Sequence, residues 1–411
     1  MSIDNNNTKL SAEKIFTLLY DDGAFTQLLP ATDSSDAAVA CGKVCGQNVY
    51  AFTQSKDAQV GAMSADKARK LTKIYNMAVK TGYPVVGFYT QSGAKVTEGN
   101  QLLDSLGDLL ACSSRLSGVV PQISVVMGDC VGTTAMLASN ADFVIMTQDA
   151  KLSLSADCDC KGLSKAAVVT EDAQSAIDAT IELLTYLPAN NLSVAPAAQA
   201  QDGEVFDADS ELKLYTAKES AAEVSLARLG GKALGVVKTK GQEIDSKASK
   251  KIASFVRFCD AFSLPVITFV NAEDFCCLGS ANCVLSAFAE ATTVKISVVE
   301  GTATGAVYMA LAGKAGRNDA TIGMEGAVIS PVKPEAAAYI MLGDKLTGTV
   351  AQQDAQIKEF IATELTAEKA AKAGYVDDVA DTYTLRTKLI NYLDVFSSKR
   401  EANLPKKHTT I

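Results

Sequence analysis

The stretch ISVVMGDCVG, residues 123–132, recurs later in the chain as ISVVEGTATG, residues 296–305. Six of the ten positions are identical, at a constant offset of 173 residues. Each copy starts with a continuously apolar run, which is typical of a strand buried on both faces. Each copy ends on a glycine that precedes helix-forming residues. The repeat therefore predicts that one chain builds the same strand, glycine turn and helix twice.

The repeat extends over nearly the whole chain. Each half opens with a predicted β-hairpin, followed by an amphipathic helix, a strand led by proline, and a further helix before the repeated strand. The hairpins are expected at 39–54 and 226–241, the strands at 84–89 and 265–270, and the further helices at 98–115 and about 277–291. Residues 186–211, rich in Pro, Ala, Asn and Asp, separate the halves.

Length and charge restrict the class of protein. A chain of 411 residues fits two domains of about 200 residues each. A net charge of −9 argues against a nucleic-acid surface, because phosphate binding needs clustered Lys and Arg. No apolar run of about 18 residues is present, and the first ten residues lack the order of a signal peptide. We expect a soluble, cytoplasmic protein whose basic ending, SSKREANLPKKH, is a solvated tail.

Cysteine and histidine exclude several chemistries. The ten cysteines show no paired C-x-x-C spacing, so we expect small, buried, reduced thiols and no metal site. The only histidine is His408, near the C-terminus, which excludes a Ser-His-Asp or Cys-His nucleophile system. No phosphate-binding loop or dinucleotide-binding glycine motif occurs.

The repeated glycines, Gly132 and Gly305, lie where a buried strand meets a helix N-terminus. One interpretation is that they only permit a tight turn. The other is that each turn presents backbone N–H groups to a ligand, because the first N–H groups of a helix have no intrahelical acceptor. The duplication favours two oxyanion holes, one in each half.

At this point the sequence resembles the carboxyltransferase (β) subunits of biotin-dependent acyl-CoA carboxylases and the related acyl-CoA decarboxylases of the crotonase superfamily. The propionyl-CoA carboxylase β and methylmalonyl-CoA decarboxylase α branch fits better than bacterial acetyl-CoA carboxylase, whose zinc ribbon is missing. The segments that carry the resemblance, in family order, are KTGYPVVGFYTQSGAKVTEG, SGVVPQISVVMGDCVG, ADFVIMTQDAKL, LARLGGKALGVV, ASKKIASFVRFCDAFSLPVITFV, AEATTVKISVVEGTATGAVYMA, GYVDDV and SKREANLPKKH.

The resemblance implies an α/β fold of two tandem crotonase-like βαβ spiral domains, 1–200 on the acyl-CoA side and 201–411 on the biotin side. It also implies a homo-oligomer, a trimer of dimers, with the active site between the N-domain of one subunit and the C-domain of another. One oxyanion hole would polarise the acyl-CoA thioester oxygen, and the other would stabilise the biotin ureido oxygen. This chemistry needs no catalytic histidine.

The site residues follow from the same resemblance. The family's first hole maps to Gly93 and Ala94, with Gly132 and Thr133 at the helix start. The second hole maps to Gly305 and Ala306, facing a turn around Phe275 and Cys276. Lys95 is expected either to contact CoA phosphate or to be an ordinary surface lysine.

Three segments depart from the family pattern: QSGAK at 91–95 stands for S-G-G-A-R, VGTT at 131–134 for A-G-G-A, and NAEDFCCLG at 271–279 for D-T-P-G-F-x-P-G. The last turn gains Glu273 and Asp274, which add negative charge where an anion is to be stabilised. These two carboxylates are interpreted as a solvated loop or, alternatively, as a new acid/base pair.

The chain has no A-M-K-M biotinylation motif and no biotin carboxylase segment. The resemblance therefore implies biotin on a separate biotin carboxyl carrier protein, an acyl-CoA thioester as substrate, and a biotin carboxylase or a membrane decarboxylase subunit as partner. The main hypothesis is a carboxyltransferase that moves a carboxyl group between carboxybiotin and an acyl-CoA. The alternatives are a non-catalytic paralogue that acts as scaffold or regulator, and biotin-independent acyl-CoA chemistry.

Overall fold

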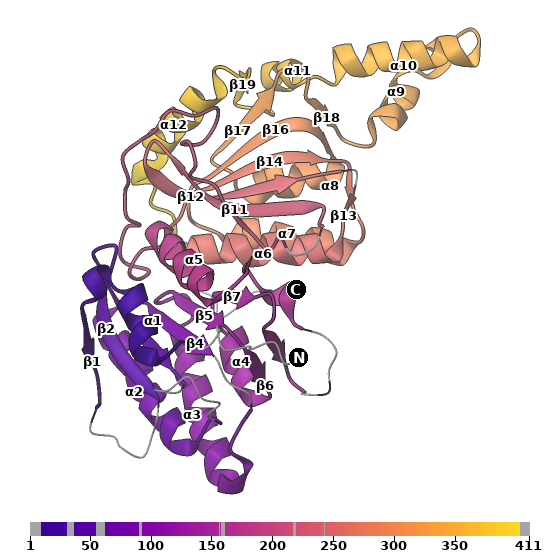
Figure 1. The fold of residues 1–411 in the computed structure, drawn as a ribbon. Coiled ribbons are helices and arrows are strands. Elements are labelled where there is room, and N and C mark those ends of the chain that lie inside the picture. Colours follow the sequence, from indigo (N-terminus) through magenta and orange to yellow (C-terminus); the bar gives the residue numbers. More distant parts are fainter. Residues whose placement is uncertain are drawn as a thin grey trace, which may run out of the picture. The chain divides into compact units, whose positions relative to one another are not determined.

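The computed structural model describes residues 10–30, 37–54, 62–89, 93–155, 157, 161–216, 219–241 and 243–402. The chain forms two compact units. Unit 1 comprises Met1–Pro196 with Tyr215–Lys218, and unit 2 comprises Ala197–Leu214 with Glu219–Ile411. Both combine a mixed β-sheet with α-helices (Figure 1).

The sheet of unit 1 has the order β1-β2-β3-β4-β5-β7-β9. It is antiparallel from β1 to β3 and parallel from β3 onward. Its strands are β1 (Phe25–Gln27), β2 (Ala38–Val44), β3 (Gln47–Thr53), β4 (Val85–Tyr89), β5 (Gln122–Val126), β7 (Phe143–Thr147) and β9 (Val168–Thr170). A small parallel pair joins β6 (Asp129–Val131) to β8 (Lys151–Ser153). The helices are α1 (Ala12–Leu19), α2 (Ala65–Thr81), α3 (Asn100–Leu116), α4 (Thr133–Ser139) and α5 (Ala173–Tyr186), with 3-10 turns η1 (Asp21–Gly23), η2 (Val96–Glu98) and η3 (Leu163–Lys165).

Unit 2 repeats this arrangement with the order β10-β11-β12-β14-β16-β17-β19, antiparallel from β10 to β12 and parallel beyond. Its strands are β10 (Leu212–Leu214), β11 (Ala222–Leu229), β12 (Lys232–Thr239), β14 (Val266–Ala272), β16 (Lys295–Thr304), β17 (Ala320–Met324) and β19 (Asp378–Ala380). β18 (Val328–Ser330) pairs with β16, and β13 (Glu243–Ile244) pairs with β15 (Asp274–Phe275).

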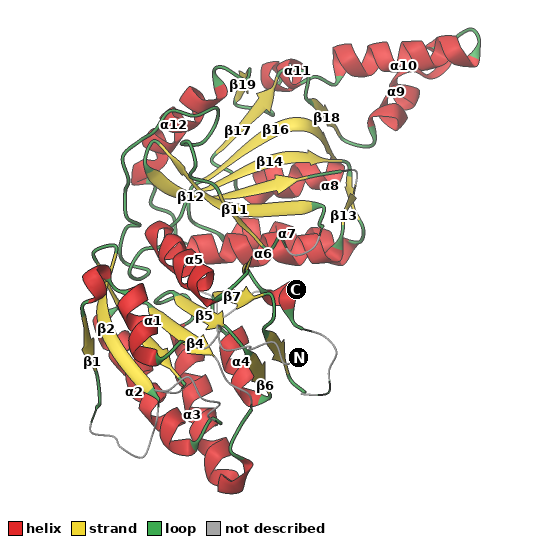
Figure 2. Ribbon diagram, viewed as in Figure 1, coloured by secondary structure: helices red, strands yellow, loops and turns green. Residues whose placement is uncertain are grey.

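The helices of unit 2 are α6 (Ser246–Ala261), α7 (Leu278–Glu290), α8 (Gly305–Val307), the π-helical turn η4 (Tyr308–Ala312), α9 (Pro334–Leu342), α10 (Val350–Glu364), α11 (Ala367–Lys372) and α12 (Leu385–Val395), with 3-10 turns η5 (Lys314–Gly316), η6 (Gly343–Lys345) and η7 (Phe396–Ser398). Figure 2 shows α6 and α7 running along one face of the unit 2 sheet. Figure 1 shows α9 and α10 extending away from that sheet.

The repeated apolar runs are central strands in both units. Residues 123–126 belong to β5 and are buried, and residues 296–299 belong to β16 and are buried as well. Each is followed by a glycine and a helix, α4 or α8, so the predicted duplication is confirmed at the level of elements. Both predicted hairpins are confirmed too, with two-residue turns at 45–46 and 230–231.

The helices ahead of the proline-led strands form for identifiable reasons. Ser64 and Asp245 cap α2 and α6 by accepting the backbone N–H of the third residue beyond them. Gly82 ends α2 in the left-handed conformation, at φ 69°. The apolar stripe of α6, which includes Ile252 and Val256, is buried. These helices therefore fix the strands that lead to the candidate sites.

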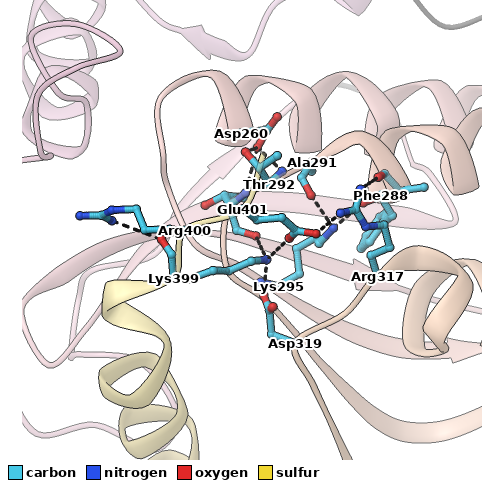
Figure 3. Close-up of polar contacts among 12 residues, drawn as sticks. Asp260, Phe288, Ala291, Thr292, Lys295, Arg317, Asp319, Lys399, Arg400 and Glu401 are labelled. Atoms are coloured by element: carbon cyan, nitrogen blue, oxygen red, sulfur yellow. Dashed lines mark hydrogen bonds and ion pairs between the residues drawn. The ribbon is translucent and has the colours of Figure 1, made fainter. Parts of the chain in front are cut away.

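The interpretation of residues 397–408 as a solvated tail is wrong for their first part. The Lys399 side chain is 12% exposed, and its Nζ lies 2.9 Å from Asp319 Oδ2 and 2.9 Å from Glu401 Oε2. Arg317 also pairs with Glu401, and Figure 3 shows these side chains gathered beside Lys295. These ion pairs hold the segment against the rest of unit 2. Residues 403–411, including His408, lie outside the described residues.

The expectation of buried thiols holds only in part. Cys130 and Cys259 are buried, but Cys45, Cys276 and Cys277 are exposed. Cys158 and Cys160 lie outside the described residues. Among the residues that the structure describes, no three or more His, Cys, Asp or Glu are arranged to hold a metal ion, and no helix is long and apolar enough to cross a membrane.

Candidate functional site

The first candidate turn of unit 1 follows β4. Gly93 has φ +75°, and its carbonyl accepts the N–H of Met63 at 3.2 Å. The Lys95 N–H donates to Met63 O at 2.9 Å, so Ala94 is held in a parallel bridge beside Met63. The turn is thereby anchored to the segment that enters α2. Gln91 and Ser92 lie outside the described residues.

Lys95 is an exposed residue whose Nζ lies 3.3 Å from Glu98 Oε1. Glu98 is itself a capping group, because its Oε2 accepts the N–H of Ala65 at 2.7 Å. That backbone hydrogen bond, together with Lys95, lowers the pKa of Glu98. The carboxylate therefore fixes both the start of α2 and the side chain of Lys95.

The second turn of unit 1 joins β6 to α4. Gly132 has φ 71° and ψ −144°, and its N–H donates to Ser153 O at 3.0 Å. This hydrogen bond uses the Gly132 donor, so Gly132 shapes the turn. Thr133 is the first residue of α4, where an N–H has no intrahelical acceptor. Thr133 is thus the candidate donor at this turn.

These two turns lie side by side. A Cβ added to Gly93 would stand 3.8 Å from Val131 Cγ2, next to Gly132. Segments separated by about 40 residues in the sequence therefore meet at the same end of the unit 1 sheet, as expected for two turns that follow neighbouring parallel strands. The geometry suits a ligand oxygen approached from two backbone segments.

The corresponding turn of unit 2 joins β16 to α8. Gly305 has φ +39°, and a Cβ added there would stand 2.9 Å from Pro331 O. Only glycine fits this space without a shift of the backbone. Gly305 and Ala306 open α8, so their N–H groups are at a helix start. The hydroxyl of the preceding residue, Thr304, donates to Glu273 O and ties this turn to the one that follows β14.

In the facing turn, around Phe275 and Cys276, the backbone N–H groups already donate hydrogen bonds within the chain. Phe275 is buried, and its N–H donates to Asp274 Oδ1 at 2.8 Å. The Cys276 N–H donates to Ile244 O at 3.1 Å, as part of the β13–β15 pairing. Both backbone donors expected here already have acceptors. Within the described residues of unit 2, Gly305 and Ala306 are therefore the candidate donors.

The thiol of Cys277 is a functional group that was not predicted from the sequence. This residue is the N-cap of α7, and its Sγ lies 3.8 Å from Cys276 Sγ and 3.3 Å from Ser280 Oγ. The Ser280 hydroxyl beside this sulfur is the first cause that lowers the pKa of Cys277 to about 7. The available signal was a cysteine at the predicted start of a helix, where the helix dipole favours a thiolate.

The comparisons with known proteins agree with this architecture. A model of the carboxyl transferase domain matches residues 33–158 and 211–411; residues 1–32 and 159–210, which include α5, are not matched. Methylmalonyl-CoA decarboxylase subunit alpha of Veillonella parvula is 27% identical over 98% of this chain and 93% of that protein. Propionyl-CoA carboxylase beta chain of Cereibacter sphaeroides is 27% identical over 98% of this chain and 94% of that protein.

A solved structure supports the same conclusion. The transcarboxylase 12S structure with methylmalonyl-coenzyme A and methylmalonic acid bound superposes with a TM-score of 0.88, at 25% identity, over 98% of this chain and 92% of that one. The resemblance noted in the sequence and the tandem α/β fold are thereby confirmed. The chain belongs to the carboxyl transferase domain family, and its two units are crotonase-like domains in tandem.

Proposed function

We propose that this chain is a carboxyltransferase component that moves a carboxyl group between carboxybiotin and an acyl-CoA. The observation that carries the proposal is the duplicated strand, left-handed glycine and helix start at Gly132 and Gly305. Two such turns supply backbone donors for two developing oxyanions, one on the thioester and one on the biotin ureido group. The family relationship sets the chemistry within which this duplication is interpreted.

In the proposed mechanism, unit 1 holds the acyl-CoA. The N–H groups of Ala94 and Thr133 would polarise the thioester oxygen, and Gly93 and Gly132 would shape their turns. Lys95 would contact CoA phosphate through its exposed ammonium group. Backbone dipoles suit this role because they are fixed before the reaction and need no reorganisation when charge develops.

Unit 2 would hold the biotin end. The turn at Gly305 is closely packed, because an added Cβ would stand 2.9 Å from Pro331 O. Such a turn would bind the ureido group through backbone N–H donors. The N–H groups of Gly305 and Ala306 would stabilise the ureido oxygen, and Phe275 and Cys276 would border the group. When bound, biotin would carry the transferred carboxyl group and would supply a base for the acyl α-proton.

The proposed partners follow from the relatives, which are named as a subunit alpha and a beta chain of larger enzymes. We propose a separate biotin carboxyl carrier protein, and a biotin carboxylase or a membrane decarboxylase subunit. Exposed thiols such as Cys45 and Cys276 persist in a reducing compartment, so we propose the cytoplasm as the location. We also propose a homo-oligomer, a trimer of dimers, because the similar transcarboxylase 12S forms a hexamer and α9 carries the exposed side chains Tyr339, Ile340 and Met341.

A second candidate is a non-catalytic carboxyltransferase paralogue that assembles or regulates a carboxylase. It is favoured by the backbone donors of Gly132, Phe275 and Cys276, each of which already has an acceptor within the chain. Such a paralogue would bind partner subunits and acyl-CoA without turnover.

Transcarboxylation by the purified full chain separates these candidates. Malonyl-CoA and methylmalonyl-CoA would serve as donors, free biotin or a biotinyl carrier domain as acceptor, and acyl-CoA products would be followed by mass spectrometry. Biotin-dependent decarboxylation of either donor is the expected result. Acyl-CoA binding without turnover, even with a carrier, would favour the scaffold.

A further inference from the structure

A cluster of thiol and hydroxyl groups lies where α6 and α7 begin. Ser246 is the first residue of α6, and its Oγ lies 3.0 Å from Ser280 Oγ and 3.4 Å from Cys276 Sγ. Ser280 Oγ lies 3.2 Å from Cys276 Sγ and 3.3 Å from Cys277 Sγ. The two adjacent cysteines therefore share two hydroxyl neighbours, those of Ser246 and Ser280, at the N-terminal ends of two packed helices.

The surroundings of Cys277 favour its thiolate. The helix that it caps, α7, is 13 residues long, so the N-terminal end of the dipole is close to the sulfur. The hydrogen bonds of Ser280 lower the pKa of Cys277 to about 7. Burial instead raises the pKa of Cys130 to about 12 and raises that of Cys259 as well. Among the described thiols, Cys277 thus combines exposure with a lowered pKa.

Charged neighbours do not explain this pKa. Charged residues lie on several elements near the two cysteines. They are Glu243 of β13, the α6 cap Asp245, Lys247 in the first turn of α6, Glu273 between β14 and β15, Asp274 of β15 and Lys314 of η5. Three of the four carboxylates lie within four residues of Cys277 in the sequence or cap α6, and a negative charge near a thiolate would disfavour it. Asp245 and Asp274 each accept a hydrogen bond from a backbone N–H group, which partly compensates the negative charge of the carboxylate. The causes that lower the pKa of Cys277 are hydrogen bonds, those of Ser280 first, followed by those of Cys276 and Ser246.

We propose that Cys277 and Cys276 form a redox-active thiol pair that hydroperoxides oxidise. The Cys277 thiolate attacks one oxygen of the hydroperoxide, the S–O bond forms and the O–O bond breaks. The alkoxide or hydroxide that leaves takes a proton from water, so sulfur is oxidised to a sulfenic acid and the peroxide is reduced. Cys276 sulfur then attacks the Cys277 sulfur; its own proton and the departing hydroxide leave as water, and a disulfide remains.

The position of the pair makes this oxidation reversible. Adjacent Cα atoms are about 3.8 Å apart, below the usual range for a disulfide of about 4.4–6.8 Å. A disulfide between neighbours is therefore strained and readily reduced by thiols. The pair follows the turn whose Glu273 carbonyl accepts the Thr304 hydroxyl beside Gly305. Oxidation would therefore also lower carboxyl transfer, a consequence that rests on the proposed function.

The test uses the reduced full chain, treated with hydrogen peroxide and the sulfenic-acid reagent dimedone, followed by peptide mass spectrometry. Wild type is expected to lose two hydrogens, about 2 Da, in the peptide that holds both thiols. Cys276→Ser should accumulate the dimedone adduct on Cys277, and Cys277→Ser should show neither product. Cys45→Ser is the matched control, because Cys45 is exposed but has a raised pKa, and it should behave as wild type.

The rate of alkylation by iodoacetamide as a function of pH supplies an independent measurement. Cys277 should react with a midpoint near pH 7. At pH 7 its larger thiolate fraction, offset by lower intrinsic nucleophilicity, predicts a rate about threefold above that of an ordinary thiol. Three results would each refute the redox-active pair: a midpoint above pH 8, a Cys277 alkylation rate no greater than that of Cys45, or a dimedone adduct that persists in wild type. None of these measurements needs carboxyl transfer, so the two proposals can fail separately.

Discussion

Gly305 occupies a position that excludes any side chain on two grounds. Its φ of +39° is unfavourable for an L-residue, and an added Cβ would meet the Pro331 carbonyl at 2.9 Å. The turn at Gly132 is different, because a Cβ there would meet nothing within 4 Å. The two glycines therefore differ in how strictly the fold requires them, although they occupy equivalent positions in the repeat.

The Gly305→Ala variant should lose turnover by about 100-fold or more, because a displaced turn moves the proposed donors away from the developing charge. Acyl-CoA binding, measured by calorimetry, should be retained. Gly230→Ala is the matched control, since Gly230 has φ +60° in a hairpin turn where an added Cβ meets nothing within 4 Å. Turnover of Gly305→Ala at the wild-type rate would remove this turn from the mechanism.

Lys295 is a buried cation that satisfies backbone carbonyls. Its Nζ donates to Phe288 O, to Ala291 O at 2.6 Å and to Gly316 O at 3.2 Å. Figure 3 shows its side chain directed toward the end of α7. The lysine therefore caps the C-terminal end of α7, where carbonyls have no intrahelical donor.

Lys295→Met should reduce the free energy of unfolding by roughly 2–4 kcal/mol, because it leaves buried carbonyls without donors. Urea denaturation followed by circular dichroism measures the change. Lys314→Met, at an exposed position of η5, serves as the control and should change stability by less than about 0.5 kcal/mol. Equal stability of both variants would refute the capping role.

At the scale of elements, Asp142 links the starts of two parallel strands. Its carboxylate accepts the N–H of Gln122, the first residue of β5, at 2.8 Å, just before β7 begins. Burial raises the pKa of Asp142 to about 7, although the Gln122 hydrogen bond opposes the shift. Between pH 4 and 7 the folded state therefore holds a proton that the unfolded state has released.

The sign follows from this difference: Asp142 contributes stability below pH 4 that is lost as the pH rises through 7. Asp142→Asn keeps an acceptor for Gln122 and removes the titration. We expect the variant to be more stable than wild type at pH 8, on the order of 1 kcal/mol, and to gain nothing at pH 4. A stability difference that is the same at both pH values would contradict this account.

The strands and helices were predictable from the sequence, whereas the acceptors of individual backbone N–H groups were not. The apolar runs at 123–126 and 296–299 identified the central strands, because burial on both faces leaves a local signal. The acceptor of the Gly132 N–H is Ser153, 21 residues away, and that of Cys276 is Ile244, 32 residues away. Such pairings depend on the register of β6–β8 and β13–β15, short strands without a strong local pattern.

At the scale of the whole molecule, α9 and α10 form an arm of unit 2 (Figure 1). The arm exposes Ile340 and Met341 at 74% and 68%, more than expected for residues of this kind. Such a surface is typical of an interface between subunits. We propose that it contributes to the homo-oligomer.

The Ile340→Glu and Met341→Glu double variant should therefore sediment or elute as a smaller species than wild type, as measured by light scattering after gel filtration. Leu192→Glu, which changes a more exposed leucine in unit 1, is the control. An unchanged mass for the arm variant, together with an oligomeric wild type, would place the interface elsewhere.

The central claim is that the chain transfers a carboxyl group between an acyl-CoA and biotin. The most direct measurement follows isotope from carboxyl-labelled methylmalonyl-CoA in a mixture of the full chain and a biotinyl carrier protein. The account predicts that label appears on the carrier, and that Gly305→Ala slows this transfer by about 100-fold or more. Label that never reaches the carrier, or that is released at the same rate without it, would contradict the account.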